Sequence, residues 1–145
     1  MRLRHIGFVF QFFNLIPALT VLENIELPLA LAGVEKAERR RMALELLCYF
    51  DLESLGERSP ESLSGGERQR VAVIRALTNN PEIILADEPA SSLDDENSDL
   101  LTGLLSEINR ERKVAIVIST TNLHEKLPTN RDYFLREGRL HIRSS

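Results

Sequence analysis

The sequence LSGGERQR occupies residues 63–70, and the sequence IILADEP follows at residues 83–89. The first segment is a Gly-Gly turn that opens a helix, and the second is an apolar strand that ends in two carboxylates, Asp87 and Glu88. A helix start offers free backbone N–H groups to an anion, and glycines let a phosphate approach the backbone closely. Carboxylates at the tip of a buried strand can hold a hydrated Mg²⁺ and position a water. Together the two segments indicate phosphate chemistry on an α/β scaffold.

Apolar runs and helical patterns alternate along the rest of the chain. We expect strands at residues 5–10, 81–86 and 114–118, and helices at residues 37–50, at residues 67–78 and after Asp94, which can cap the helix that follows. Residues 133–136 and 139–142, joined by a turn at Glu137-Gly138, predict a closing hairpin. Apolar strands that alternate with helices are typical of an α/β fold with a largely parallel sheet.

Finer expectations concern individual helices. Pro28 is expected to break a helical stretch at residues 21–31. The helix at residues 37–50 should bury one face, Cys48 should pack in the core, and three arginines should form a solvated helix start. The residues expected on the buried faces are Leu44, Leu47 and Cys48 in this helix and Leu100, Leu101, Leu104, Leu105 and Ile108 in the helix after Asp94, and the three arginines are Arg39, Arg40 and Arg41.

Size and composition indicate one ordinary globular domain. The chain has 145 residues, 43% hydrophobic and 28% charged, and a net charge of −4, which gives no reason to expect nucleic-acid binding. One cysteine, Cys48, excludes an intrachain disulfide and a cysteine-based metal site. No secretory signal is recognisable, and the uncharged stretch at residues 7–22 is interrupted by Gln11, Asn14 and Pro17, so it does not predict a membrane span.

The two opening segments resemble the signature motif and the Walker B motif of the ATP-binding subunits of ABC transporters. Residues 6–11 resemble the strand and Q-loop of that family, and residues 91–94 (SSLD) resemble its D-loop. The resemblance implies an α/β fold with a partial P-loop NTPase (RecA-like) parallel-sheet core and the ABC helical subdomain. It makes residues 1–145 a partial nucleotide-binding domain, with the helical subdomain at about residues 12–80 and the Walker B and D-loop part at 81–145. Residues 12–33 are similar to the subgroup for lipoprotein release and macrolide export.

Roles for individual residues follow from the resemblance. It implies that Glu88 is the general base on the attacking water and that Asp87 orients the Mg²⁺ shell. Gln11 would bind Mg²⁺ or water and relay the nucleotide state to a transmembrane partner, and Asp94 would lie in a D-loop that crosses a dimer interface. The residues Ser64, Gly65, Gly66 and Glu67 would close over the γ-phosphate held by the opposite subunit. ATP and Mg²⁺ are the implied cofactors.

The resemblance also implies partners and a location. The implied partners are a transmembrane permease subunit and a second nucleotide-binding subunit, which is either identical to this chain or different from it. No nucleic-acid partner is implied. The implied location is cytoplasmic and peripheral, on the inner face of the cell membrane. The apolar cluster after Gln11 has two readings, core packing or a groove for a helix of the membrane subunit. Its members are Phe12, Phe13, Leu15, Leu19 and Leu22.

Two departures from the family pattern are visible. No GxxxxGK[ST] phosphate-binding loop occurs, since none of the lysines Lys36, Lys113 and Lys126 has that context, and ten residues precede Gln11. The chain therefore resembles the C-terminal portion of an ATP-binding domain, and we expect its sheet to lack a central strand and to leave open edges. Thr120 stands where the family usually has a switch histidine, which a shifted His124 could replace.

Each candidate residue also has a simpler reading. Ser64 and Asp94 can be plain helix caps, Gln11 a glutamine at a sheet edge, and Asp87 and Glu88 a polar strand end. Three functions remain open at this point. The chain is part of an ATP-hydrolysing subunit, or a degenerate partner that lends its signature motif to another ATPase subunit, or a remnant without function.

Overall fold

The computed structural model describes residues 5–122 and 127–143. Its centre is a three-stranded parallel sheet in the order β1 (Ile6–Phe10), β2 (Ile83–Asp87), β3 (Ala115–Ser119). The register pairs Phe10 with Asp87 and Asp87 with Ser119, so the three strands end at the same level. The loops that follow the strands therefore begin side by side at the carboxyl edge of the sheet. This confirms the expected α/β fold with a parallel sheet.

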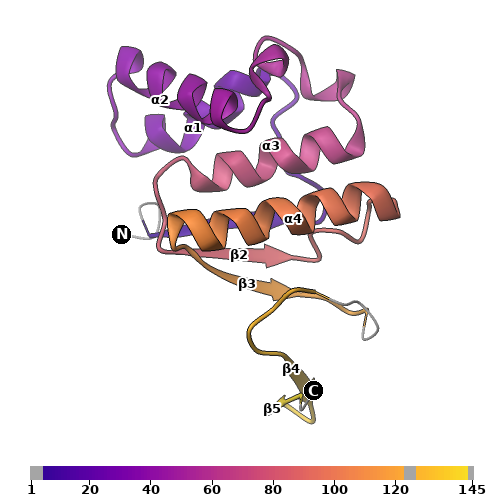
Figure 1. The fold of residues 1–145 in the computed structure, drawn as a ribbon. Coiled ribbons are helices and arrows are strands. Elements are labelled where there is room, and N and C mark those ends of the chain that lie inside the picture. The colour runs from indigo at the N-terminus through magenta and orange to yellow at the C-terminus, as the bar shows by residue number, and fades with distance from the viewer. Residues whose placement is uncertain (1–4, 123–126, 144–145) are drawn as a thin grey trace.

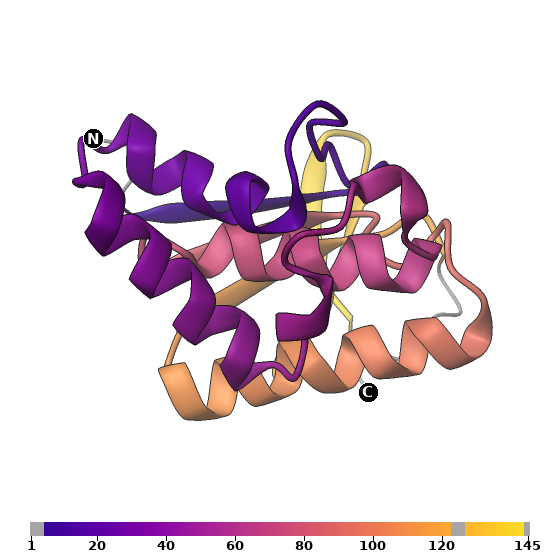
Figure 2. The same cartoon turned by 90° about the horizontal axis from the view of Figure 1, so that it is seen from above.

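Helices cover one face of the sheet in two layers. Helices α3 (Gly65–Leu77) and α4 (Asp95–Arg112) lie next to the sheet, and α1 (Val21–Leu31) and α2 (Lys36–Tyr49) form an outer layer over α3, as Figures 1 and 2 show. The short 3₁₀ turns Glu53–Leu55 and Pro60–Ser62 connect α2 to α3. Helix α3 is therefore the element between the outer helices and the sheet.

Helix α3 contributes to two hydrophobic cores. Val71 and Ile74 pack into the core between the outer helices, and Val73 and Leu77 pack into the core between the sheet and α4. A helix that is apolar on two sides is buried between two layers, which is the position that α3 takes. Phe50, at the end of α2, packs against both cores and links them.

Most expected elements are present within one or two residues of their predicted bounds, but Pro28 does not break its helix. Helix α1 runs through Pro28 to Leu31. A capping box between Thr20 and Glu23 starts the helix, and burial of residues such as Ile25 holds it, so tertiary packing outweighs the backbone hydrogen bond that a proline removes. The prediction of a break was wrong.

The expected buried faces were partly wrong. In α2 Ala43 and Leu47 are buried, whereas Leu44 and Cys48 are exposed, so Cys48 is not a core residue. In α4 the buried side chains are Leu101, Leu105 and Ile108, Leu104 is partly buried, and Leu100 is 51% exposed. A run of adjacent leucines cannot all face one side of a helix, and only the packing partner decides which of them turns outward.

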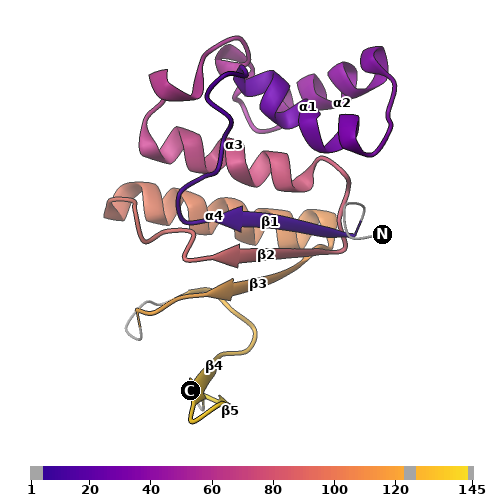
Figure 3. The same cartoon turned by 180° about the vertical axis from the view of Figure 1, so that it is seen from behind.

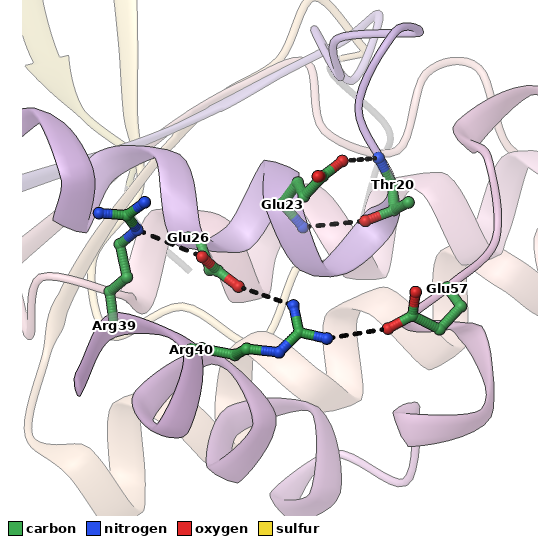
Figure 4. A network of polar contacts seen from close by, with 6 residues as sticks. All are labelled: Thr20, Glu23, Glu26, Arg39, Arg40 and Glu57. Carbon is green, nitrogen blue, oxygen red and sulfur yellow. Dashed lines mark hydrogen bonds and ion pairs between the residues drawn. The ribbon is translucent and has the colours of Figure 1, made fainter. Parts of the chain in front are cut away.

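The arginines at the start of α2 are not simply solvated, because two of them fasten α2 to α1. Glu26 of α1 is almost buried, and its carboxylate accepts hydrogen bonds from Arg39 at 3.2 Å and from Arg40 at 3.4 Å. Arg40 also reaches Glu57 at 3.2 Å (Figure 4). Among these three cations, Arg41 alone pairs within its own helix, with Glu38 and Glu45.

The expected closing hairpin is confirmed. Strands β4 (Tyr133–Arg136) and β5 (Arg139–Ile142) pair in antiparallel fashion, and every residue of both strands is exposed. Figure 1 shows this hairpin set apart from the three-stranded sheet.

The second face of the sheet carries no helix within the described residues, as Figure 3 shows from behind. Phe8, Phe10, Ile83 and Val117 are exposed large side chains of its three strands, with Val117 at 57%. Strands β1 and β3 are both edge strands, which agrees with the expectation of open sheet edges. In the ranges that the structure describes, no helix has the length and apolar character needed to cross a membrane.

Candidate functional site

The signature segment, residues 63–70, opens helix α3 at the carboxyl edge of the sheet. Ser64 is the N-cap, and its hydroxyl oxygen accepts a hydrogen bond from the Glu67 N–H at 3.2 Å. The Glu67 carboxylate in turn accepts the Ser64 N–H at 2.8 Å, which lowers the pKa of Glu67 below its ordinary value. Among the described residues, no side chain accepts a hydrogen bond from the N–H groups of Gly65 and Gly66, and Ser64 is exposed. The predicted cap role of Ser64 is therefore present.

The two glycines of the segment have different surroundings. A Cβ added to Gly66 would lie 1.9 Å from Oδ1 of Asn97, so a side chain at this position would displace the Asn97 side chain at the start of α4. A Cβ on Gly65 would meet Leu93 at 3.7 Å, an ordinary contact. Packing within this chain therefore explains Gly66 and does not explain Gly65.

Asp87 and Glu88 end strand β2 at the same edge. Asp87 is exposed and accepts a hydrogen bond from the Ser119 hydroxyl, its neighbour on β3. Glu88 is half-buried and has a φ of 48°, a left-handed conformation that costs energy for a residue with a side chain. Its carboxylate accepts the Thr121 N–H at 3.0 Å, and its own N–H donates to the Ser119 carbonyl at 2.9 Å. The backbone of Glu88 is thus bonded to β3, and its carboxylate is bonded to the loop after β3.

Gln11 directly follows β1 and is half-buried. Beyond Phe12, residues Phe13 and Asn14 have positive φ values of 63° and 49°, so the chain turns sharply here. The guanidinium of Arg75 from helix α3 donates hydrogen bonds to the Phe13 carbonyl at 2.8 Å and to the Asn14 carbonyl at 2.5 Å. Burial lowers the pKa of Arg75 from its ordinary value. The turn after Gln11 is therefore fastened to the helix that the signature segment opens.

Asp94 caps helix α4, as predicted. Its carboxylate accepts the Asn97 N–H at 2.9 Å, and this bond is the largest cause of a pKa below the ordinary value. The side-chain amide of Asn97 also donates to Asp94. Ser91 and Ser92 are exposed between the Glu88 turn and this cap. The cap reading and a role in a D-loop are compatible, because Asp94 caps the helix and is still exposed.

Thr120 and His124 were the candidates for the switch position. Thr120 is half-buried just beyond β3, and its hydroxyl oxygen accepts the Asn122 N–H at 3.1 Å. Its loop lies at the edge with Glu88, since the Thr121 N–H binds that carboxylate. His124 lies outside the described residues.

Two lysines lie in described parts of the chain, and neither follows a strand at the carboxyl edge. Lys36 begins helix α2 in the outer layer, and Lys113 ends helix α4 before strand β3. A lysine that binds phosphates in a P-loop lies at a strand-to-helix turn, and neither Lys36 nor Lys113 has that position.

The edge offers only part of a magnesium ligand set. Asp87 pairs with Phe10 on the neighbouring strand, and Gln11 directly follows Phe10, so the two candidate ligands stand next to each other at the strand ends. No group of three or more His, Cys, Asp or Glu residues that could hold a metal ion occurs in the described ranges. Mg²⁺ commonly keeps several waters and takes one or two carboxylates plus substrate phosphates, so this set fits a nucleotide-bound Mg²⁺ and not a free one.

The apolar cluster after Gln11 divides between both of its readings. Leu22 is buried in the outer core and Leu15 packs against that core. Phe12 is 71% exposed, and the half-buried Phe13 ring lies under the Arg68 guanidinium at 5.6 Å. Leu15 and Leu22 therefore serve packing, Leu19 is half-buried, and Phe12 is the exposed member of the cluster.

Sequence reasoning missed the residues that connect the loops. Arg75 and Asn97 act through contacts that no spacing rule reveals, and Gln69 is fully buried on α3. A signal for Gln69 exists, because it stands four residues before Val73 and eight before Leu77, in an otherwise apolar stripe. A lone polar residue in such a stripe is buried and needs hydrogen-bond partners.

Comparison with known sequences supports the resemblance. The profile of a family described as "ABC transporter" matches residues 1–91. The chain is 49% identical over 119 residues to "ABC transporter ATP-binding protein YtrE" of Bacillus subtilis (strain 168), which covers 82% of this chain and 52% of that protein. It is 40% identical over 141 residues to "ABC transporter H family member 2" of Dictyostelium discoideum, which covers 97% of this chain and 28% of that protein.

Solved structures agree with the sequences. A dimeric post-hydrolysis state of the ATP-binding cassette MJ0796, bound to ADP and Pi, superposes with a TM-score of 0.79 at 42% identity and covers 97% of this chain and 64% of that one. A putative metal-chelate type ABC transporter in an inward-facing conformation gives a TM-score of 0.83 at 31% identity, with 95% of this chain and 57% of that one covered. The chain spans about half the length of YtrE and less than two thirds of both solved chains. With its parallel sheet, its helix-opening LSGGERQR and its match over residues 1–91, the chain belongs to the ABC transporter ATP-binding family.

Proposed function

We propose that this chain is part of an ATP-binding and ATP-hydrolysing subunit of an ABC transporter. The observation that carries the proposal is the convergence at one sheet edge of the signature helix start, the Asp87–Glu88 strand end and the turn after Gln11. Its support in sequence is the identity of 49% to YtrE and 42% to the MJ0796 cassette.

In this proposal each residue at the edge has one task. Glu88 takes a proton from the attacking water, and its fixed carboxylate supports that task because a base must lie within hydrogen-bond reach of the water. Asp87 and Gln11 supply oxygen ligands for Mg²⁺, which neutralises phosphate charge when it is bound. The remaining phosphate contacts require a phosphate-binding loop. Such a loop has the pattern GxxxxGK[ST], which does not occur in these 145 residues.

The signature segment acts on a second nucleotide-binding subunit. Ser64, Gly65 and Gly66 present a helix start with free N–H groups, to which the γ-phosphate of the opposite subunit binds, and Asp94 lies at the same interface. The surroundings of Gly65 support this role, since an added Cβ would make only an ordinary contact with Leu93, and no neighbour among the described residues requires a glycine there. The MJ0796 cassette, whose structure is dimeric, supports a dimer of like or unlike chains.

A transmembrane permease subunit is the remaining partner, and the exposed Phe12 beside Gln11 is the surface we assign to it. The chain would then lie peripherally on the cytoplasmic face of the cell membrane. The proposal that the transporter exports its substrate or releases lipoproteins rests only on the resemblance of residues 12–33 to that subgroup. Among the relatives is a protein named as a methionine import ATP-binding protein, 47% identical over 121 residues, so general identity does not determine the direction of transport.

A second candidate function rests on the Thr120 position and the lack of a phosphate-binding pattern. In it the chain is a degenerate, non-hydrolysing partner that lends its signature segment to a competent ATPase subunit. The third reading, a remnant without function, predicts no effect on any partner.

A mixed-subunit assay tests these readings. The chain is added to a competent ATP-binding cassette, and ATP hydrolysis is followed with and without it. We expect stimulation that Ser64→Arg abolishes, because the arginine fills the space in which a γ-phosphate would bind. Ser54→Arg is the matched control, since Ser54 is also exposed and lies in the 3₁₀ turn Glu53–Leu55. An absence of stimulation, or an equal loss in both variants, contradicts a signature role.

A second measurement separates the two functional readings. The coding sequence upstream of residue 1 is determined first. If it encodes a segment with a GxxxxGK[ST] pattern, that segment is joined to the chain. The hydrolysing reading predicts ATPase activity that Glu88→Gln lowers by about 100-fold or more. The degenerate reading predicts that Glu88→Gln leaves stimulation of the partner unchanged.

A further inference from the structure

Gln69 of helix α3 is the most completely buried polar side chain near the site, with 0% exposure. It lies within the signature segment but has no role in the proposed chemistry. Two loops at the carboxyl edge meet this side chain, although the loops are far apart in sequence.

The side-chain amide of Gln69 binds both loops. Its Nε2 donates to the carbonyl of Pro89 at 2.6 Å and to the carbonyl of Phe10 at 3.4 Å. Pro89 directly follows Glu88, and Phe10 directly precedes Gln11. One amide group therefore joins the backbone beside the candidate base to the backbone beside the candidate magnesium ligand.

The two acceptors determine how the amide is oriented. A reversed amide would place its oxygen against two carbonyl oxygens, so the nitrogen must face them. The oxygen Oε1 is buried and has no hydrogen-bond partner among the described residues. A buried acceptor without a partner lowers stability, and a residue that only filled space would be apolar. The side chain is therefore explained by its two donated bonds and not by packing.

Both loops need such an anchor. Glu88 holds a left-handed φ of 48°, and a strained conformation persists only when its surroundings enforce it. The turn after Gln11 contains two more left-handed residues, Phe13 and Asn14, which Arg75 binds from the same helix. Helix α3 thus contacts both loops through two side chains that lie about two turns apart.

We infer that Gln69 is a positioning residue that holds the backbone at Gln11 and at Glu88 in fixed relation to the signature helix. It acts through those residues and does not touch a substrate. The importance of Gln11 and Glu88 rests on the proposed function, but the positioning itself does not require ATP.

Amide hydrogen exchange on Gln69→Met tests the inference. Methionine is similar in length and cannot donate, so it removes both bonds and also the unpaired oxygen. The reporters are the amides of Phe13, Glu88 and Ser91. The Phe13 and Ser91 N–H groups donate within the two loops, to the carbonyls of Phe10 and Glu88, and the Glu88 N–H donates to the Ser119 carbonyl of β3. We expect exchange at least about 10-fold faster in both loops, while the melting temperature stays the same or rises because the unpaired acceptor is gone.

A packing role predicts the opposite pattern. If Gln69→Met lowers the melting temperature and leaves both loops unchanged, or releases only one of them, the inference is wrong. Thr78→Val is the control, since Thr78 is buried on the same helix but its hydroxyl donates only to carbonyls of that helix.

If Gln69→Met does not fold, a measurement on the unsubstituted chain tests the positioning role of Gln69. The chain contains two glutamines, Gln11 and Gln69, so glutamine-selective isotope labelling leaves two side-chain amide groups to assign by nuclear magnetic resonance. Both Nε2 protons of Gln69 should exchange at least about 100-fold more slowly than those of the half-buried Gln11. Equal exchange overturns the inference. Neither measurement uses nucleotide, so a failed ATPase assay and a failed positioning test remain distinguishable.

Discussion

At the scale of single residues, Gly66 is the position where one atom decides the packing of two helices. We expect Gly66→Ala to lower the free energy of unfolding by about 2 kcal/mol, because its Cβ would lie 1.9 Å from Asn97 Oδ1. Gly65→Ala should be neutral or slightly stabilising, since its nearest neighbour is at 3.7 Å. Urea unfolding measures both. Asn97→Ala in the Gly66→Ala background should recover most of the loss, and a failure to do so would show that the contact with Asn97 is not the cause.

Also at this scale, Glu67 makes stability depend on pH. Its pKa is lowered in the folded chain, chiefly by the Ser64 N–H, so its contribution is present above the ordinary pKa of a glutamate and is lost as pH falls through the lowered value. We expect Glu67→Gln to cost about 0.5 kcal/mol near neutral pH, a small value because solvent screens the half-exposed carboxylate. The difference from the unsubstituted chain should vanish in acid. A constant difference from pH 7 to about pH 2 would contradict the ionic capping box.

At the scale of elements, the bond between α1 and α2 depends on one buried carboxylate. Glu26→Ala should cost about 2 kcal/mol, because Glu26 is almost buried and its loss removes the acceptor of two arginines. Glu57→Ala is the matched control and should cost about 0.5 kcal/mol or less, since Glu57 binds Arg40 with a side chain that is 78% exposed. Thermal unfolding of both variants measures the difference. Equal losses would mean that burial of Glu26 does not matter.

The elements also show which parts of the fold can be predicted. Strands β1, β2 and β3 are continuous apolar runs, and α3 and α4 begin at capping residues, so local signals suffice for them. The prediction that Pro28 breaks helix α1 was wrong, because burial along the helix outweighs one lost hydrogen bond. The outward turn of Cys48 could not be predicted either, since it depends on where the neighbouring layer lies.

At the scale of the whole molecule, the uncovered sheet face predicts self-association. Parallel sheets are normally covered on both faces, whereas here Phe8, Phe10 and Val117 are exposed on one face. Sedimentation velocity should show association that rises with concentration, and Val117→Lys should reduce it by placing a charge on the face. Leu44→Lys is the control, since Leu44 is 43% exposed on α2 in the outer layer. A chain that stays monomeric at all concentrations would contradict this prediction.

The site shows the same division between local and tertiary information. Asp87, Glu88, Gln11, Ser64 and Asp94 could be named as candidates from the sequence because they match the family's motifs, and the strand end and the helix caps among them also have local signatures. Their relative placement could not, since it depends on the parallel register of β1, β2 and β3 and on helix α3 packing along the sheet with its first turns near the strand ends.

The sequence by itself determined the α/β class, the order of the elements and the family, because hydrophobic periodicity and two phosphate-related segments are properties of short stretches of chain. Only the tertiary structure decided which face of each helix is buried, that Gly66 meets Asn97, and that Gln69 joins two distant loops. The physical reason is that these contacts join residues about 20 to 60 positions apart, and such contacts form only when the layers pack together.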